Sequence, residues 1–172
     1  MESLISLLTK YNIDISLYGN NCKTLNDLLK EIEENEIKLV EIDNKLIREV
    51  KVLWIEIYQN NKKLVEKKQY FHKTGLIRER NICLGEKCYL NESFEEAFKR
   101  ALKEELPTLL EYTYIKDPEY LTRVEVSKSY PGLITKYIDC KYYIESYNLK
   151  DSFEIIEYED HKPRLTTTWK FE

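Results

Sequence analysis

The sequence predicts an α+β fold, because helix-like and strand-like patterns of hydrophobic residues occupy separate stretches of the chain. Two short amphipathic segments come first, and three strand-like runs follow between residues 48 and 84. One capped amphipathic helix is predicted over Asn91–Leu106, after which strand-like runs continue to residue 172. With 172 residues, the chain is long enough for one domain with a sizeable core.

The N-terminal part of the chain predicts two short helices. Residues 3–10 carry leucines on one side, and Thr24 is placed to cap a second helix whose apolar residues recur at helical spacing. We expect residues 1–45 to form a helical extension that packs on a main domain of residues 46–172. Binding of a partner through these helices is the alternative.

Strands are predicted on both sides of the central helix. Before it they cover residues 48–59, 62–73 and 76–84, and after it residues 109–115, 123–128, 133–143, 153–160 and 164–172. Asn60-Asn61 is expected to turn the first hairpin, and residues 160–163 the last. We expect Asp117-Pro118 to start a turn or one helical turn, and Pro131-Gly132 to form a type II turn.

The central helix has clear start and stop signals. Ser93 is a good N-cap, and Glu96 three residues later completes a capping box. Pro107 ends the helix, because it lacks a backbone N–H and its ring clashes with the preceding turn. The predicted helix therefore covers most of Asn91–Leu106.

One acidic residue of this helix falls on its apolar side. With Phe94 as the zero of a wheel at about 100° per residue, Glu105 lies near ~20°, in the middle of the apolar face. A buried carboxylate needs a basic partner, a set of hydrogen-bond donors or a cation. Glu96, Arg100 and Glu104 are spaced so that ordinary surface ion pairs are an alternative to any functional role.

The run NESFEEAFKRALKEEL resembles the signature helix of Nudix hydrolases, whose pattern is G-x5-E-x7-R-E-U-x-E-E-x-G-U, with U aliphatic. Glu92, Arg100, Leu102, Glu104 and Glu105 match it. The resemblance implies a Nudix-like α/β/α sandwich around a mixed sheet, with the N-terminal helices as an extension. It also implies that Glu104 and Glu105 would ligate Mg²⁺ or Mn²⁺ and, with Arg100 orienting them, would carry any catalysis.

Three departures from the pattern bear on activity. Ala101 stands where the family has its first metal-binding glutamate, Pro107 stands where it has glycine, and six residues instead of five separate Gly85 from Glu92. The resemblance therefore implies a degenerate signature with a weak metal site. Residues 129–133 and Trp169, together with the altered helix, are also similar to a Nudix-like family of algae, protists and large DNA viruses.

Three functional hypotheses follow. The first is a Nudix-like domain that binds a nucleotide or a protein partner without efficient hydrolysis, with Arg78, Arg80 or Arg100 near a phosphate. The second is an active Mg²⁺- or Mn²⁺-dependent pyrophosphohydrolase of nucleoside diphosphate derivatives. In it, Glu92, Glu96 or a carboxylate of the late strands would replace the missing ligand. The third is a structural or self-associating protein with a homodimer face.

The composition limits the classes of binding partner that we expect. A net charge of −4 argues against a broad surface for nucleic acid, and no run of the sequence is long and apolar enough to span a membrane. The four cysteines (Cys22, Cys83, Cys88 and Cys140) form no CxxC pair, so we expect reduced thiols in a cytoplasmic protein. The first residues do not resemble a secretory signal.

Overall fold

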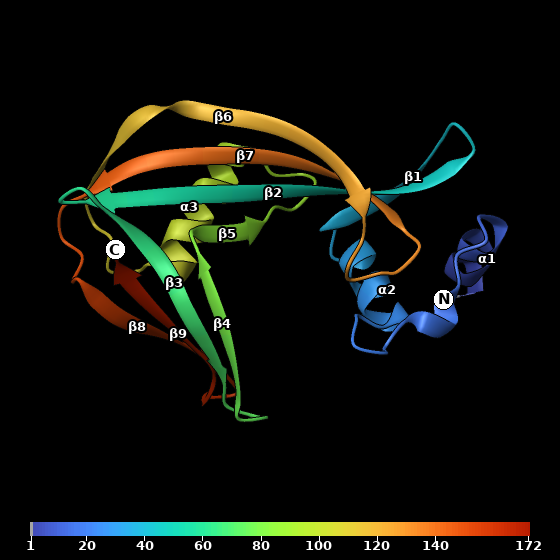
Figure 1. Cartoon of the computed structure of the whole chain (residues 1–172), viewed down its shortest axis with the longest axis horizontal. Coiled ribbons are helices and arrows are strands. Elements are labelled where there is room, and N and C mark those ends of the chain that lie inside the picture. The colour runs from blue at the N-terminus through green and yellow to red at the C-terminus, as the bar shows by residue number, and fades with distance from the viewer. Residues whose placement is uncertain (1) are drawn as a thin grey trace. The chain divides into compact units, whose positions relative to one another are not determined.

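The computed structural model describes residues 2–172 and confirms the α+β class (Figure 1). The helices are α1 (Glu2–Lys10), a 3-10 turn (Ile15–Leu17), α2 (Leu25–Glu33) and α3 (Phe94–Glu105). The strands are β1 (Ile37–Ile42), β2 (Lys45–Gln59), β3 (Lys62–Phe71), β4 (Leu76–Ile82), β5 (Leu84–Lys87), β6 (Tyr112–Val126), β7 (Ile134–Ser146), β8 (Ser152–Glu159) and β9 (Lys162–Phe171). No described helix has the length and apolar character that a membrane span requires.

The strands hydrogen-bond in the order β6-β7-β2-β3-β9-β8, with β1 and β5 also paired to β2 and β4 paired to β3. The described residues divide into two compact units. The first unit contains residues 2–52, Lys87–Ser93 and Tyr120–Cys140, and the second contains Leu53–Glu86, Phe94–Glu119 and Lys141–Glu172. Strands β2, β6 and β7 contribute residues to both units.

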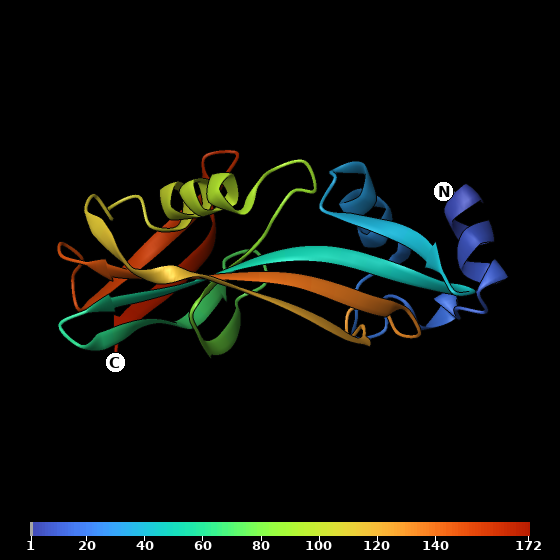
Figure 2. The same cartoon turned by 90° about the horizontal axis from the view of Figure 1, so that it is seen from above.

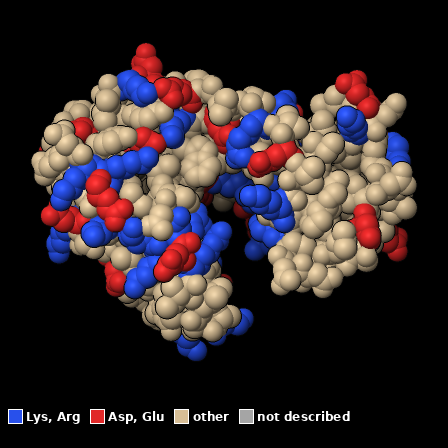
Figure 3. Space-filling view, viewed as in Figure 1, with Lys and Arg blue, Asp and Glu red and all other residues tan. Residues whose placement is uncertain are grey.

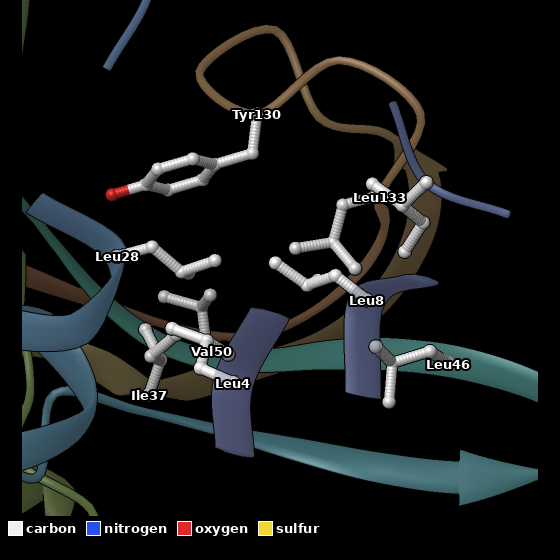
Figure 4. Close-up of a cluster of buried hydrophobic side chains, with 9 residues drawn as sticks. Leu4, Leu8, Leu28, Ile37, Leu46, Val50, Tyr130 and Leu133 are labelled. Atoms are coloured by element: carbon white, nitrogen blue, oxygen red, sulfur yellow. The ribbon is translucent and has the colours of Figure 1, made fainter. Parts of the chain in front are cut away.

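The first unit has a hydrophobic core built from α1, α2, β1, β2 and the turn after β6. Leu8, Leu28, Tyr130 and Leu133 are fully buried there, and Leu4, Ile13, Ile37, Leu46 and Val50 complete the cluster (Figure 4). Thr24 caps α2 with a complete capping box, as predicted. Gly132 has a φ of 83°, the left-handed backbone that its predicted turn position requires.

A buried ion pair lies beside this core. Arg48 of β2 donates to Glu31 of α2 at 2.7 Å, and both side chains are almost completely buried. Lys23 and Lys87 also contact the Glu31 carboxylate, at 2.5 and 3.0 Å. Burial raises the pKa of Glu31, but the hydrogen bonds from Lys23 and Arg48 outweigh it and bring the pKa to about 2.

The second unit packs α3 against one face of its strands (Figures 1 and 2). Phe98 of α3 stacks on Tyr142 of β7, with ring centroids 4.4 Å apart and planes 24° from parallel. In the strand layer, β9 pairs antiparallel with both β3 and β8. Trp169 of β9 is among the largest fully buried side chains.

Three hairpins close through two-residue loops whose residues both have positive φ, which is the type I′ geometry. The loops are Asp43-Asn44, Asn60-Asn61 and Asp160-His161. The two hairpins predicted from the sequence, β2–β3 and β8–β9, are confirmed. Strand β1 was not predicted.

The turn expected at Asp117-Pro118 is wrong. The structure has one continuous strand there, β6, from Tyr112 to Val126. Strand β6 ends the strand order and, among the described strands, pairs with β7 alone. Because an edge strand leaves every second N–H unbonded to the sheet, the missing N–H of Pro118 does not interrupt the pairing.

Candidate functional site

The site predicted from the signature lies on α3 of the second unit. The helix begins at Phe94, directly after Ser93, and ends at Glu105, two residues before Pro107. Its buried face consists of Ala97, Phe98, Ala101 and Leu102, which agrees with the predicted wheel. The helix thus presents its last residue, Glu105, one turn beyond Ala101 on the same side.

Glu105 is half-buried, and other carboxylates surround it. Burial, and then in order of effect the negative charges of Glu157, Glu86, Glu66 and Glu104, together raise the pKa of Glu105 to about 7. Among residues 2–172, the Glu105 carboxylate makes neither a hydrogen bond nor an ion pair. Helical spacing predicted that this carboxylate would lie at the apolar side of the helix; of the partners expected for it, no basic side chain among residues 2–172 pairs with it.

Glu66 of β3 is the most deeply buried acid of this group, with 5% of its surface exposed. Its Oε1 atom has no hydrogen-bond partner and lies 3.4 Å from Nε of Arg80 on β4. Burial raises the pKa of Glu66, while the charges of Arg80 and Arg78 oppose that rise. The β3–β4 pair therefore supplies one carboxylate, Glu66, whose negative charge is only partly balanced by the two arginines.

Arg100 and Glu104 pair with each other on the more exposed side of α3. Nη1 of Arg100 lies 3.1 Å from Glu104 and 3.2 Å from Glu86 of β5. The Glu104 side chain is 56% exposed, so Glu104 and Glu105 occupy different environments although they are adjacent in sequence. The alternative of a surface ion pair between Arg100 and Glu104 is thus realised in the structure.

Two small residues shape the helix surroundings. Ala101 is completely buried, so its methyl group packs where the signature has a carboxylate. A Cβ atom on Gly85 of β5 would come within 2.5 Å of the Trp54 ring. Gly85 therefore allows β5 to pass close to an aromatic side chain, which is a packing role for the residue that precedes the signature.

The carboxylates around Glu105 meet one of the two requirements of a Mg²⁺ or Mn²⁺ site. Their oxygen atoms are the ligand type that such hard cations select. Within residues 2–172, however, no three His, Cys, Asp or Glu side chains come together as a metal-ion site. The donor chemistry suits a divalent cation, but the side chains as placed do not form a complete set of ligands.

Sequence reasoning named none of the acids Glu66, Glu86 and Glu157, although it allowed for a carboxylate from the late strands, where Glu157 lies. They come from β3, β5 and β8, and the sheet topology brings them near α3. One signal was available for Glu66, because strand alternation places it on the same side as the buried Leu64. The other two have no local signature.

Comparisons with known proteins give a weak likeness. No protein-family model and no curated protein sequence matches the chain. Among solved structures, the chain matches a NUDIX-family hydrolase from Clostridium perfringens at 19% identity, with a TM-score of 0.38, over 69% of this chain and 79% of that chain. It matches a MutT mutator protein from Bacillus halodurans at 20% identity, with a TM-score of 0.35, over 71% of this chain and 68% of that chain. These TM-scores are too low to assign an activity to this chain.

Proposed function

We propose that the second unit is a Nudix-like domain that binds a nucleotide-like ligand through a weakly held divalent cation, without efficient hydrolysis. The supporting observation is the half-buried Glu105 among Glu66, Glu86, Glu104 and Glu157. It is combined with a buried Ala101 where the signature has a glutamate. The negative charge would attract a cation, and Arg80 or Arg100 would lie near a phosphate.

The cation is expected to bind weakly because few ligands are left for it. Carboxylates supply both the charge and the coordination positions of a hard cation. With Ala101 in place of one of them and Glu104 engaged by Arg100, fewer oxygens are left to hold the metal. A diphosphate would then be bound without the full polarisation that hydrolysis requires.

Cation binding is tested by thermal unfolding in Mg²⁺ or Mn²⁺. A ligand that binds the folded state raises its melting temperature, so millimolar Mg²⁺ should raise that of the wild type. Glu105→Gln should reduce the shift, whereas Glu95→Gln, an exposed residue paired with Lys99, should keep it. An equal shift in all three proteins would disprove binding at Glu105. No shift at millimolar Mg²⁺, together with no nucleotide binding in a calorimetric titration, would exclude binding of a cation and a nucleotide.

Hydrolysis is tested by restoring the missing carboxylate. Ala101→Glu should be less stable than the wild type without metal, because it buries a charge, and should show a larger Mg²⁺ shift. Ala101→Gln has nearly the same size and no charge, and it serves as the control. Diphosphate hydrolysis that appears in Ala101→Glu alone would support a decayed site. Hydrolysis by the wild type would disprove the proposal.

An active pyrophosphohydrolase is the second candidate, and one observation favours it. Of the four acids around Glu105, Glu157 of β8 exerts the largest effect, so a late strand offers a carboxylate that could replace the missing one. This candidate predicts turnover by the wild type with Mn²⁺ or Mg²⁺ on a panel of nucleoside diphosphate derivatives. It also predicts loss of turnover in Glu157→Gln.

A further inference from the structure

The part of β6 that lies in the first unit, residues 120–126, has an open edge. Strand β6 stands at one end of the strand order and pairs with β7 on one side only. The outward backbone N–H and C=O groups of residues 122–126 therefore point away from the sheet and can pair with another strand. Such an edge is a template for strand addition unless it is short, charged or covered.

The exposed side chains on this edge are largely apolar. The exposed fractions are 69% for Tyr120, 63% for Leu121, 62% for Val124 and 63% for Val126. Tyr120, Val124 and Val126 share one face of the strand, because alternate residues point the same way. Isolated exposed apolar residues are normal, but several on one open edge mark a surface for association.

Two charged residues on the opposite face are held in place. Nε of Arg123 donates to Asp139 of β7 at 2.7 Å, and Nη1 lies 2.7 Å from Glu125. The guanidinium also lies over the Tyr137 ring, 3.9 Å from its centroid. Since a guanidinium has five N–H donors, Arg123 is fixed in position and still has donors for a second carboxylate.

We propose that residues 122–126 pair with the same residues of a second copy of this chain, as antiparallel strands related by a two-fold axis at Val124. In that register Arg123 faces Glu125 of the second copy, and Glu125 faces its Arg123. Both charge pairs are then satisfied by one symmetry operation. On the other face, Val124 meets Val124 of the second copy, and Thr122 meets Val126.

This charge pattern favours a second copy over a strand of another protein. An arginine and a glutamate two residues apart on one face complement themselves only when an identical strand runs antiparallel. Moving the axis by one residue, to Arg123, would place like charges opposite each other, which is unfavourable. The edge thus specifies both its partner and its register.

The experiment measures the mass of the full chain by light scattering over a range of concentrations. The wild type should move from 20.7 kDa toward twice that mass as concentration rises. Val124→Lys and Val124→Glu should each stay monomeric, because each places like charges opposite each other at the axis. An equimolar mixture of the two variants should recover the doubled mass, because the introduced lysine of one copy then faces the introduced glutamate of the other. Circular dichroism checks that both variants fold.

The control is Tyr158→Lys. Tyr158 is 62% exposed on β8, the strand at the other end of the order, and its replacement should leave association unchanged. A wild type that stays at 20.7 kDa at every concentration would overturn the proposal and leave the edge to a strand of another protein. Doubled mass in both separate Val124 variants would also overturn it, since the copies would then associate through another surface.

Discussion

At the scale of single residues, Glu105 is a carboxyl group whose ionisation the fold opposes. Its pKa is raised from 4.5 to about 7, so the folded protein keeps a proton that the unfolded chain has lost between those two values. Stability should therefore fall as pH rises through this range, by on the order of 2 kcal/mol for a half-buried group, and the loss is complete above pH 7.

Replacement of Glu105 by glutamine should remove this dependence. Glu105→Gln is expected to be more stable than the wild type at pH 8. It should lose that advantage at pH 4.5, where the side chain at position 105 is neutral in both folded proteins. Urea unfolding at the two pH values measures the difference, with Glu95→Gln as the exposed control. An advantage of equal size at both pH values would show that Glu105 is not the titrating group.

Glu31 is the opposite case, because its pKa is lowered to about 2. A carboxylate with a lowered pKa contributes stability above its unfolded pKa of about 4.5, and the contribution is lost as pH falls toward 2. Glu31→Gln leaves Arg48 buried without its counter-charge, which should cost about 3 to 5 kcal/mol at pH 7. The cost should shrink at pH 3.

Denaturant unfolding of Glu31→Gln at both pH values tests this. Glu34→Gln is the matched control, since Glu34 is an exposed acid of the same region and pairs with Lys30 at 3.7 Å. Exposed pairs contribute at most about 1 kcal/mol. A comparable loss in both variants would mean that the Glu31–Arg48 pair is not especially stabilising.

At the scale of elements, the three two-residue hairpins depend on residues that tolerate left-handed backbone. Asparagine and aspartate adopt this conformation more readily than most residues, but His161, with a φ of 63°, carries a larger side chain into it. His161→Gly should raise the free energy of unfolding by about 0.5 kcal/mol, because glycine relieves the strain. His161→Val should lower it by about 1 to 2 kcal/mol.

Thermal unfolding of the two His161 variants gives the comparison. The pair is informative because the two substitutions have opposite expected signs at one exposed position. Equal destabilisation by glycine and valine would show that the imidazole, and not the backbone angle, matters at this turn.

The elements also show how far local sequence determines structure. Thr24 capped α2 and Asn60-Asn61 turned a hairpin as expected, since caps and tight turns depend on neighbouring residues. The turn expected at Pro118 was wrong because proline interrupts a strand only where the N–H that it lacks would have bonded to a neighbouring strand. Whether that N–H is paired depends on the position of the strand in the sheet, which is not a local property.

At the scale of the whole molecule, the candidate site also combines features that local sequence determines with features that the strand order determines. The inward position of Glu105 could be read from helical spacing, but Glu66, Glu86 and Glu157 come from three strands. Their proximity to Glu105 depends on the order β2-β3-β9-β8 and on the pairing of β5 with β2, which no local pattern contains. The sequence therefore identified the helix of the site, but of the strand residues it indicated only a late-strand carboxylate without naming it.

The charge of the whole molecule predicts poor binding to nucleic acid. The net charge is −4, and Figure 3 shows basic and acidic side chains mixed on its visible face. Non-specific binding needs a concentrated positive surface. Fluorescence anisotropy with labelled duplex DNA and single-stranded RNA at physiological salt should show no saturable binding at micromolar protein. Saturation that weakens steeply with salt would contradict this.

The pairing of β3 has a consequence for how the chain is made. Strands β2 and β3 are joined by two residues and close as soon as both are synthesised, but β3 must also bond to β9, where Leu64 faces Phe171. On a ribosome, about a hundred further residues are added before that partner emerges. The nascent chain therefore carries an unfinished sheet for several seconds. During this interval the unpaired edge of β3 is exposed, and a chaperone would protect it from association with other chains.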